Sequence, residues 1–244
     1  MKLILSHIFN PFYFLFFGLL LLIFHPIQFL SLKLGGYTAH KKTVDLLNFF
    51  LVQNFKTING KVRFSGFEKI PKNRPLIIIS NHQSNFDIPS IAWGFRKFHP
   101  KYISKIELSK GLPSVSFNLK YGGSAIIDRK NARQSIREIA TLGNLIENNK
   151  YAACIFPEGT RGKNGRLKTF KESGIKTLLK AAPSAIIVPY VICCNYRLLQ
   201  YGNYPLAFGE KLRYQVLDPI EPASFSVEEL INEVENQIRL ALNQ

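Results

Sequence analysis

Two residues whose types and spacing suit chemistry are His82 and Asp87, in the sequence Asn-His-Gln-Ser-Asn-Phe-Asp at residues 81–87. Histidine is the side chain whose ordinary pKa suits proton abstraction near neutral pH. A carboxylate five residues later can return across a turn to hold the other ring nitrogen. Asp87 also precedes Ile88 and Pro89, where it can cap a helix. The pattern indicates a general base, and its shortness leaves open a polar turn in which Asp87 only caps.

A second segment, Phe-Pro-Glu-Gly-Thr-Arg-Gly at residues 156–162, follows an apolar run. A loop bounded by glycines presents backbone N–H groups and one arginine fork, which suits a phosphate or a developing oxyanion. A plain surface turn is the alternative, because Gly and Pro also make turns without a function. A third segment, at residues 122–129, ends in Asp128 and Arg129. The three segments together predict a site with one base and two arginines.

The elements that must position these segments alternate between strand and helix patterns. Apolar, β-branched runs at residues 76–80, 123–128, 151–157 and 185–194 predict buried strands. Apolar residues at helical spacing predict one helix from Ile136 to Ile146, and residues 169–181 predict another. Ser226 and Glu229 form a capping box that begins a last amphipathic helix. This alternation predicts an α/β domain with helices on the faces of a sheet.

The three cysteines, Cys154, Cys193 and Cys194, give no sign of a disulfide framework or a zinc site. Their number is odd, two are adjacent, and each lies in an apolar run. We therefore predict buried thiols in a reducing compartment. We also expect no bound metal and no cofactor.

The 244-residue chain combines a net charge of +16 with 46% hydrophobic residues. The positive charge is concentrated at residues 91–180, which hold eighteen basic and six acidic side chains. No charged residue stands between Lys2 and Lys33, and this stretch contains the apolar run 11–24. Without a small-residue cleavage pattern it predicts a retained membrane anchor rather than a signal peptide. The composition thus predicts a basic body joined to an anchor.

The anchor comprises residues 1–35 and is long enough for one span of about 20 residues. Pro11 and Pro26 interrupt the run, so two short interfacial helices are the alternative. Residues 36–60 are expected to form an amphipathic connecting helix, and residues 61–244 the catalytic domain. Because basic residues follow the anchor, the positive-inside rule predicts that the body faces the cytoplasm.

The order of these segments, with Ile-Val-Pro-Tyr at residues 187–190, resembles the glycerolipid acyltransferases, most closely the bacterial 1-acyl-sn-glycerol-3-phosphate acyltransferases. The resemblance covers roughly residues 62–190. It implies a single domain with a mixed β-sheet flanked by helices. It places the catalytic pair on His82 and Asp87, and Pro189 in the fourth block of the family. The residues that it implies for the substrate phosphate are Lys105, Arg129, Glu158, Gly159, Thr160 and Arg161.

The activity that the resemblance implies is transfer of a fatty acyl group from acyl-CoA or acyl carrier protein to the sn-2 hydroxyl of 1-acyl-sn-glycerol-3-phosphate. The product is phosphatidic acid, for phospholipid biosynthesis. The hypothesis is direct attack with His82 as general base and without an acyl-enzyme, because only Ser84 accompanies it and we interpret Ser84 as structural. Alternatives are a different lysolipid or amino-lipid acceptor and thioester hydrolysis.

The expected partners are anionic membrane lipids, lysophosphatidate and the acyl thioester donor. Each basic residue near an anionic leaflet contributes about 1 kcal/mol to membrane binding. Nucleic acid is disfavoured by the apolar N-terminus, and a noncatalytic adaptor has no use for the His82–Asp87 pair. We expect a membrane-associated enzyme, at the cytoplasmic side of a bacterial inner membrane. The residues expected to contact that surface are Arg96, Lys97, Lys101, Lys163, Arg166, Lys168 and Lys171.

Overall fold

The computed structural model describes residues 1–243, with the side chain of Lys163 left outside the description. Its centre is a seven-stranded sheet with the strand order β1-β7-β6-β2-β5-β3-β4. Among the described strands, β6 and β7 pair antiparallel and the other neighbours pair parallel. The predicted mixed sheet is thereby confirmed. The strands are β1 (Lys61–Ser65), β2 (Leu76–Ser80), β3 (Pro100–Lys105), β4 (Ala125–Ile127), β5 (Ala152–Ile155), β6 (Ile186–Cys193) and β7 (Lys211–Val216).

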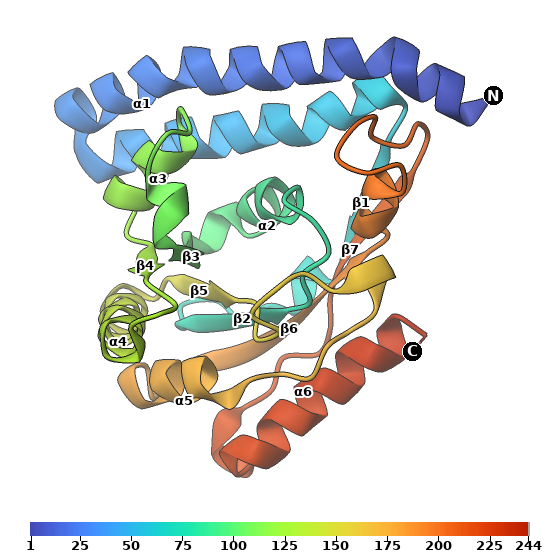
Figure 1. Cartoon of the computed structure of the whole chain (residues 1–244). Coiled ribbons are helices and arrows are strands. Elements are labelled where there is room, and N and C mark those ends of the chain that lie inside the picture. The colour runs from blue at the N-terminus through green and yellow to red at the C-terminus, as the bar shows by residue number, and fades with distance from the viewer. Residues whose placement is uncertain (244) are drawn as a thin grey trace.

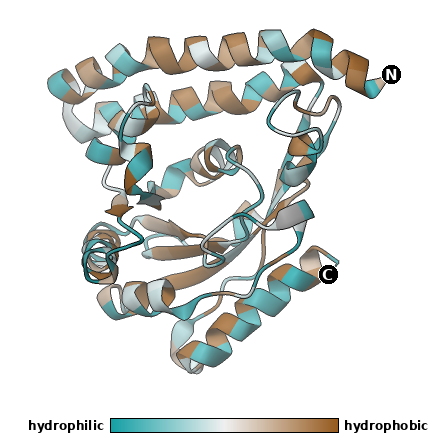
Figure 2. Ribbon diagram, viewed as in Figure 1, coloured by the Kyte–Doolittle hydropathy of each residue, from teal (hydrophilic) through white to brown (hydrophobic). Residues whose placement is uncertain are grey.

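Helices cover both faces of this sheet (Figure 1). Two apolar clusters fill the spaces between the layers, one beneath α1 and α2 and the other against α4, α5 and α6. The central strands β2, β5 and β6 are apolar and buried along their length (Figure 2), because both of their faces are covered. The helices are α1 (Lys2–Gln53), α2 (Asp87–Gly94), α3 (Val115–Tyr121), α4 (Ala132–Asn149), α5 (Glu172–Ala181) and α6 (Val227–Ala241).

Four of the strands, β2, β4, β5 and β6, lie within the runs that the sequence predicts. The helices α4 and α5 also coincide with predicted helices, and the capping box of Ser226 and Glu229 begins α6. The sequence patterns did not predict the strands β1, β3 and β7. Each of these three has a lysine in its first two residues, and β7, which lies between β1 and β6, alternates between exposed and buried residues as a strand with one solvated face does.

The helix α1 folds back on itself. Its backbone stays helical through Pro11 and Pro26 and leaves the helical conformation only at Gly36, where φ is 62°. A positive φ is readily adopted by glycine, so Gly36 makes the turn. The N-terminal arm (residues 2–35) and the C-terminal arm (residues 37–53) then run side by side in opposite directions (Figure 1). The break in the apolar segment therefore lies at Gly36 and not at the two prolines.

Side chains on one side of the N-terminal arm bind it to the body. Asn10 donates to the carbonyl of Leu206 at 2.8 Å and accepts from the N–H of the same residue at 2.7 Å. The hydroxyl of Ser114 donates to the carbonyl of Leu21 at 2.6 Å. These contacts join the arm to the body at two points along its length. The arm is thus a layer of the folded protein.

The opposite side of the N-terminal arm is apolar and uncovered (Figure 2). Among the described residues, α1 with the turn after it is the one helix that is long and apolar enough to cross a membrane. The large side chains exposed on this side are Leu3, Ile4, Ile8, Phe9, Phe12, Leu15, Phe16, Leu19, Leu22, Ile23, Ile27, Phe29, Leu30 and Leu34. An apolar surface of this extent marks a site that contacts another apolar phase.

Candidate active site

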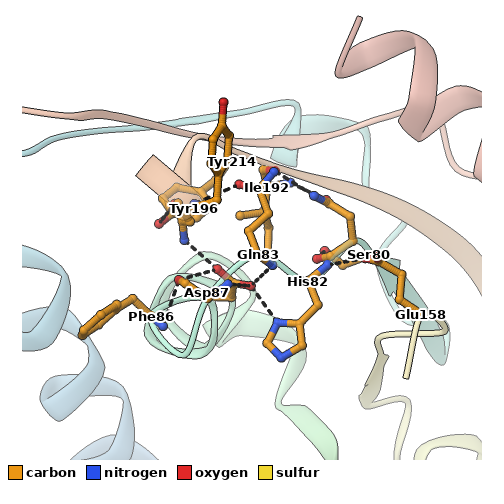
Figure 3. A network of polar contacts seen from close by, with 12 residues as sticks. Ser80, His82, Gln83, Phe86, Asp87, Glu158, Ile192, Tyr196 and Tyr214 are labelled. Carbon is orange, nitrogen blue, oxygen red and sulfur yellow. Dashed lines mark hydrogen bonds and ion pairs between the residues drawn. The ribbon is translucent and has the colours of Figure 1, made fainter. Parts of the chain in front are cut away.

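His82 lies in the loop that leaves β2 and faces Asp87, the first residue of α2 (Figure 3). The Nδ1 atom of His82 is 2.8 Å from Oδ2 of Asp87. Because a carboxylate oxygen is an acceptor, Nδ1 carries the proton and donates it, which leaves the lone pair on Nε2. The ring of Phe156 stacks on the imidazole with 4.2 Å between centroids. The His82 side chain is 21% exposed, so Nε2 can reach a substrate.

Asp87 is completely buried, and both of its carboxylate oxygens accept hydrogen bonds. Besides His82, Oδ2 accepts hydrogen bonds from the backbone N–H groups of Gln83 (2.7 Å) and Ser84 (3.0 Å). Oδ1 accepts from the hydroxyl of Ser84 at 3.0 Å and from the side-chain amide of Asn195 at 2.7 Å. The carboxylate points back into the loop and does not cap α2, whose N-cap is Phe86. The predicted catalytic pair is formed, whereas the capping role is not.

Asn195, which the sequence analysis did not identify, completes this arrangement from the far side. It is buried, and its Oδ1 accepts a hydrogen bond from the hydroxyl of Tyr214 at 2.9 Å. Asn195 directly follows β6, which is hydrogen-bonded to β2, the strand that carries His82. A polar residue at the end of a strand next to the one that carries His82 is a signal that could have identified Asn195. It needs the strand order, which the sequence alone does not supply.

Glu158, which the resemblance implies for the substrate phosphate, has both carboxylate oxygens bonded to backbone N–H groups. One of its carboxylate oxygens accepts from the backbone N–H of His82 at 2.7 Å, and the other accepts from the N–H of Lys168 at 3.0 Å. Burial raises the pKa of Glu158, although these two bonds and nearby cations act in the opposite direction. The N–H of Gly162 donates to the carbonyl of His82 at 2.9 Å. The 156–162 loop therefore holds the backbone of His82 on both sides.

Cationic side chains surround the rest of the 156–162 loop. Arg161 is exposed, and Lys168 donates to the hydroxyl of Thr160 at 2.7 Å. A Cβ atom built on Gly159, where φ is +72°, would lie 3.6 Å from Nζ of Lys171. Lys168 and Lys171 were expected at the membrane surface. The structure brings both to the loop that contains Thr160 and Arg161, and their contact with a membrane stays a prediction.

Lys105 and Arg129 lie further along the same edge of the sheet. Lys105 is the last residue of β3, Arg129 follows the carboxyl end of the parallel strand β4, and both are exposed. With neighbouring strands about 4.8 Å apart, β3 and β4 lie roughly 10 and 14 Å from β2 in the plane of the sheet. All the predicted site residues are therefore at one edge. Arg161 is in the loop that contacts His82, whereas Lys105 and Arg129 approach from the side.

Lys101 is not a surface residue, which corrects the prediction that it contacts the membrane. Its side chain is 3% exposed and donates to the hydroxyl of Tyr37 in α1 at 2.7 Å. It lies over the rings of Tyr37 and Tyr151, beside a cavity of about 20 Å³. Burial, together with the charge of Lys41, lowers the pKa of Lys101 to about 7. Lys101 joins the C-terminal arm of α1 to the sheet. The side chain of Lys163 lies outside the described part of the structure.

The family model of acyltransferases matches residues 61–193, a segment that includes His82, Asp87 and the 156–162 loop. The chain belongs to the acyltransferase family. The matched residues run from the start of β1 to the end of β6. The match therefore covers the sheet edge described above but neither α1 nor α6.

Individual relatives extend this comparison. The chain is 32% identical over 176 residues to a probable 1-acyl-sn-glycerol-3-phosphate acyltransferase of Mycoplasma genitalium, covering 66% of this chain and 61% of the relative. It is 30% identical over 164 residues to the human 1-acyl-sn-glycerol-3-phosphate acyltransferase beta, covering 65% and 56%. In three of the relatives the matched part is about half of the protein, at 48%, 56% and 57% of its length.

A solved structure shares the fold over nearly the whole chain. The 1-acyl-sn-glycerophosphate (LPA) acyltransferase PlsC from Thermotoga maritima superposes with a TM-score of 0.80 at 24% identity. The superposition covers 99% of this chain and 96% of that one. The folded hairpin of α1 and the terminal helix α6 thus belong to a known architecture, although the family model does not reach them.

Proposed function

We propose that this acyltransferase transfers a fatty acyl group from an acyl thioester to the sn-2 hydroxyl of 1-acyl-sn-glycerol-3-phosphate, with phosphatidic acid as the product. The observation that carries the proposal is the His82–Asp87 pair: Nδ1 is bound to a buried carboxylate while Nε2 is left for a substrate hydroxyl. The names of the relatives support the choice of acceptor. The donor is acyl-CoA or acyl carrier protein.

In this mechanism Nε2 of His82 takes the proton of the sn-2 hydroxyl while that oxygen attacks the thioester carbonyl carbon. The C–S bond of the tetrahedral intermediate then breaks, and the thiolate leaves with the proton that His82 had taken. Asp87 stabilises the transient imidazolium and keeps the ring in place. The bonds formed and broken balance without a cofactor.

No acyl-enzyme is needed, and the nearest hydroxyl in the sequence is not free to form one. Ser84 is buried and donates its hydroxyl hydrogen to Oδ1 of Asp87 at 3.0 Å. Its oxygen also accepts from the backbone N–H of Phe86 at 3.1 Å. These bonds give Ser84 the structural role that the sequence analysis expected.

The phosphate of the acceptor would bind at the 158–161 loop. We propose that Arg161 and the lysines beside the loop, Lys168 and Lys171, supply the positive charge. Arg129 and Lys105 would approach from the neighbouring strand ends. A guanidinium presents a planar fork that matches two phosphate oxygens, which lysine cannot reproduce. Replacement of Arg161 by Lys is therefore expected to raise KM for the lysolipid more than it lowers kcat.

The test is an assay of the purified chain with labelled oleoyl thioesters and a panel of lysophospholipids and amino-lipids. We expect product from lysophosphatidate, and loss of turnover by about 10²- to 10⁴-fold in His82→Ala. Replacement of the surface residue His7, which lies outside the site, by Ala serves as the matched control. Preference for another acceptor would contradict the substrate, and full activity of His82→Ala would contradict the mechanism.

We further propose that the hairpin of α1 lies on a membrane surface and inserts the uncovered side of its N-terminal arm into one leaflet. Support comes from the contacts that join this arm to the body at Asn10 and Leu21, which leave only one side available to lipid. Phe86 of the catalytic loop packs against Tyr13 and Phe17 of the same arm. The reacting hydroxyl would therefore be bound close to the lipid phase.

Vesicle flotation tests this placement. Replacement of Phe12, Phe16 and Leu19 by Ser is expected to reduce binding to anionic phospholipid vesicles. Each of these side chains is at least 42% exposed. The matched control is Leu240→Ser, because Leu240 is 75% exposed on α6, away from the hairpin. Equal binding of the triple variant and the control would contradict the placement.

A further inference from the structure

The end of β6 carries two adjacent cysteines that the mechanism does not use. The Sγ atoms of Cys193 and Cys194 are 2.8 Å apart, and both side chains are partly exposed. This differs from the buried thiols expected from the sequence, whereas Cys154 is 1% exposed as expected. Cys194 has a φ of 76°, in the left-handed region, and stands immediately before the 3₁₀ turn Asn195–Leu199. The chain thus turns sharply at the pair.

Arginines surround the sulfur atoms. Arg213 lies opposite Cys193 on β7, and its guanidinium donates to the Sγ atom at 3.3 Å. The hydrogen bond from the Cys194 thiol, with further help from Arg213 and Arg197, lowers the pKa of Cys193 to about 6 against the opposing effect of burial. The same hydrogen bond raises the pKa of Cys194, because the Cys194 thiol supplies the shared proton. The pair therefore presents one nucleophilic thiolate next to one thiol.

The next residue in the chain links this pair to the active site. Asn195 donates to Oδ1 of Asp87 at 2.7 Å, and it is held by Tyr214 on the same strand as Arg213. A group that bridges the two sulfur atoms must restrain the backbone at Cys194, where the chain turns towards Asn195. Such a bridge would act one residue away from a hydrogen bond that positions the catalytic carboxylate.

We propose that Cys193 and Cys194 form a dithiol site for thiophilic ligands that accept two sulfur atoms, such as trivalent arsenicals, and that its occupation lowers acyl transfer through Asn195. With an organic arsenic(III) oxide, the thiolate of Cys193 and then Cys194 attack arsenic. Two As–S bonds form, the bonds from arsenic to oxygen break, and the oxygen leaves as water with one proton from the Cys194 thiol and one from solvent. No oxidant or reductant takes part. Only the effect on acyl transfer rests on the proposed function.

Mass spectrometry of the intact chain treated with phenylarsine oxide tests the site itself. We expect one phenylarsenic group per chain, bound between Cys193 and Cys194, with Cys154 unmodified. Cys193→Ser and Cys194→Ser should each lose the bridged adduct, whereas Cys154→Ala should retain it. Replacement of Arg213 by Gln should slow the reaction. An adduct that forms equally well in both single Ser variants, or no adduct on the folded wild-type chain, would overturn the proposal.

Two measurements test the link to Asn195. The adduct is expected to reduce turnover at least several-fold, 2,3-dimercaptopropanol should restore it, and the Cys193→Ser/Cys194→Ser double variant should be insensitive. Independently of any activity, hydrogen exchange at the amides of Gln83 and Ser84, which donate to Asp87, should accelerate in the adduct. An adduct that leaves these amides unchanged would refute transmission through Asn195, even if the chain proved to act on another substrate.

Discussion

Asp87 and Lys101 are both charged side chains removed from water, at 0% and 3% exposure, but their surroundings differ. Asp87 accepts five hydrogen bonds, four of them from the loop that it closes. Among the described residues Lys101 donates one hydrogen bond, to Tyr37, and otherwise lies over aromatic rings. A buried charge with all its partners is fixed in place. One with few partners loses its charge more easily.

The difference corresponds to two roles. Asp87 positions the imidazole of His82, whereas Lys101 joins α1 to the sheet. The donors to Asp87 are already in place in the structure, so in the proposed mechanism the imidazole of His82 needs no rearrangement to act as a base. Lys101 stands on β3 and bonds to Tyr37 in the C-terminal arm of α1, outside both the loop that carries His82 and the 156–162 loop. The two sites should respond to substitution in opposite ways, which three experiments can examine.

The largest effect is expected for Asp87→Asn. The amide keeps the shape of the side chain but turns an NH₂ group towards N–H donors that need an acceptor. We expect turnover to fall by about 10²- to 10⁴-fold. The free energy of unfolding should fall by about 1 to 3 kcal/mol, because buried donors lose their acceptor. Steady-state kinetics and urea unfolding measure the two effects. Asp218→Asn, at a side chain that is 81% exposed, is the control and should change neither.

A smaller effect is expected for Asn195→Ala. This change removes one of the five donors and leaves the others, so kcat should fall by about tenfold, the equivalent of about 1.4 kcal/mol for a hydrogen bond to a charged group. KM for the lysolipid should stay the same, because Asn195 is buried behind Asp87. Tyr214→Phe, one bond further away, should have a weaker effect, and Asn232→Ala on α6 none. A rise in KM alone would show that Asn195 acts on substrate binding instead.

Lys101→Met is expected to have the smallest effect on turnover. Unlike Asp87→Asn, it should raise the free energy of unfolding. The pKa of Lys101 is about 7 in the folded chain against an ordinary value of 10.5. Below pH 7 the folded and unfolded chains both hold the proton, and the full cost of burying the charge is present. Between about pH 7 and 10.5 the unfolded chain binds more protons, so the free energy of unfolding of the wild type rises with pH.

Lys101→Met removes this dependence. Its advantage in melting temperature over the wild type should be greatest at or below pH 7 and should decrease as the pH rises towards 10. Thermal unfolding of the two chains at a series of pH values measures the difference. Lys97→Met, at an exposed lysine nearby, should show no such trend. A variant less stable than the wild type at pH 6 would mean that the bond to Tyr37 outweighs the cost of burying the ammonium group.

The sequence predicted the catalytic pair and most of the sheet because both depend on local patterns. Continuous β-branched runs identify buried strands such as Leu76–Ser80, and His82 and Asp87 are separated by one short loop. The capping box of Ser226 and Glu229 is similarly local. These features could be located without knowing which strands are neighbours.

What the sequence did not predict depends on contacts between distant segments. Asn195 and Asp87 are 108 positions apart, and they meet because β6 lies next to β2. Glu158 was expected to contact the substrate phosphate because the family resemblance implies it, whereas its carboxylate accepts a hydrogen bond from the backbone of His82. Lys101 was expected at the surface because lysines usually are. Its position on β3 beneath α1 overrides that tendency.

The attachment of His82 to the 156–162 loop has a consequence for changing the acceptor by engineering. Glu158 holds the N–H of His82 and Gly162 holds its carbonyl, so the loop with the cationic residues and the loop with the base form one unit. A replacement loop with different polar residues would also move the imidazole unless it retained both bonds. On the proposed function, acceptor preference and the alignment of His82 would therefore be inherited together, and the two loops should be exchanged between relatives as one module.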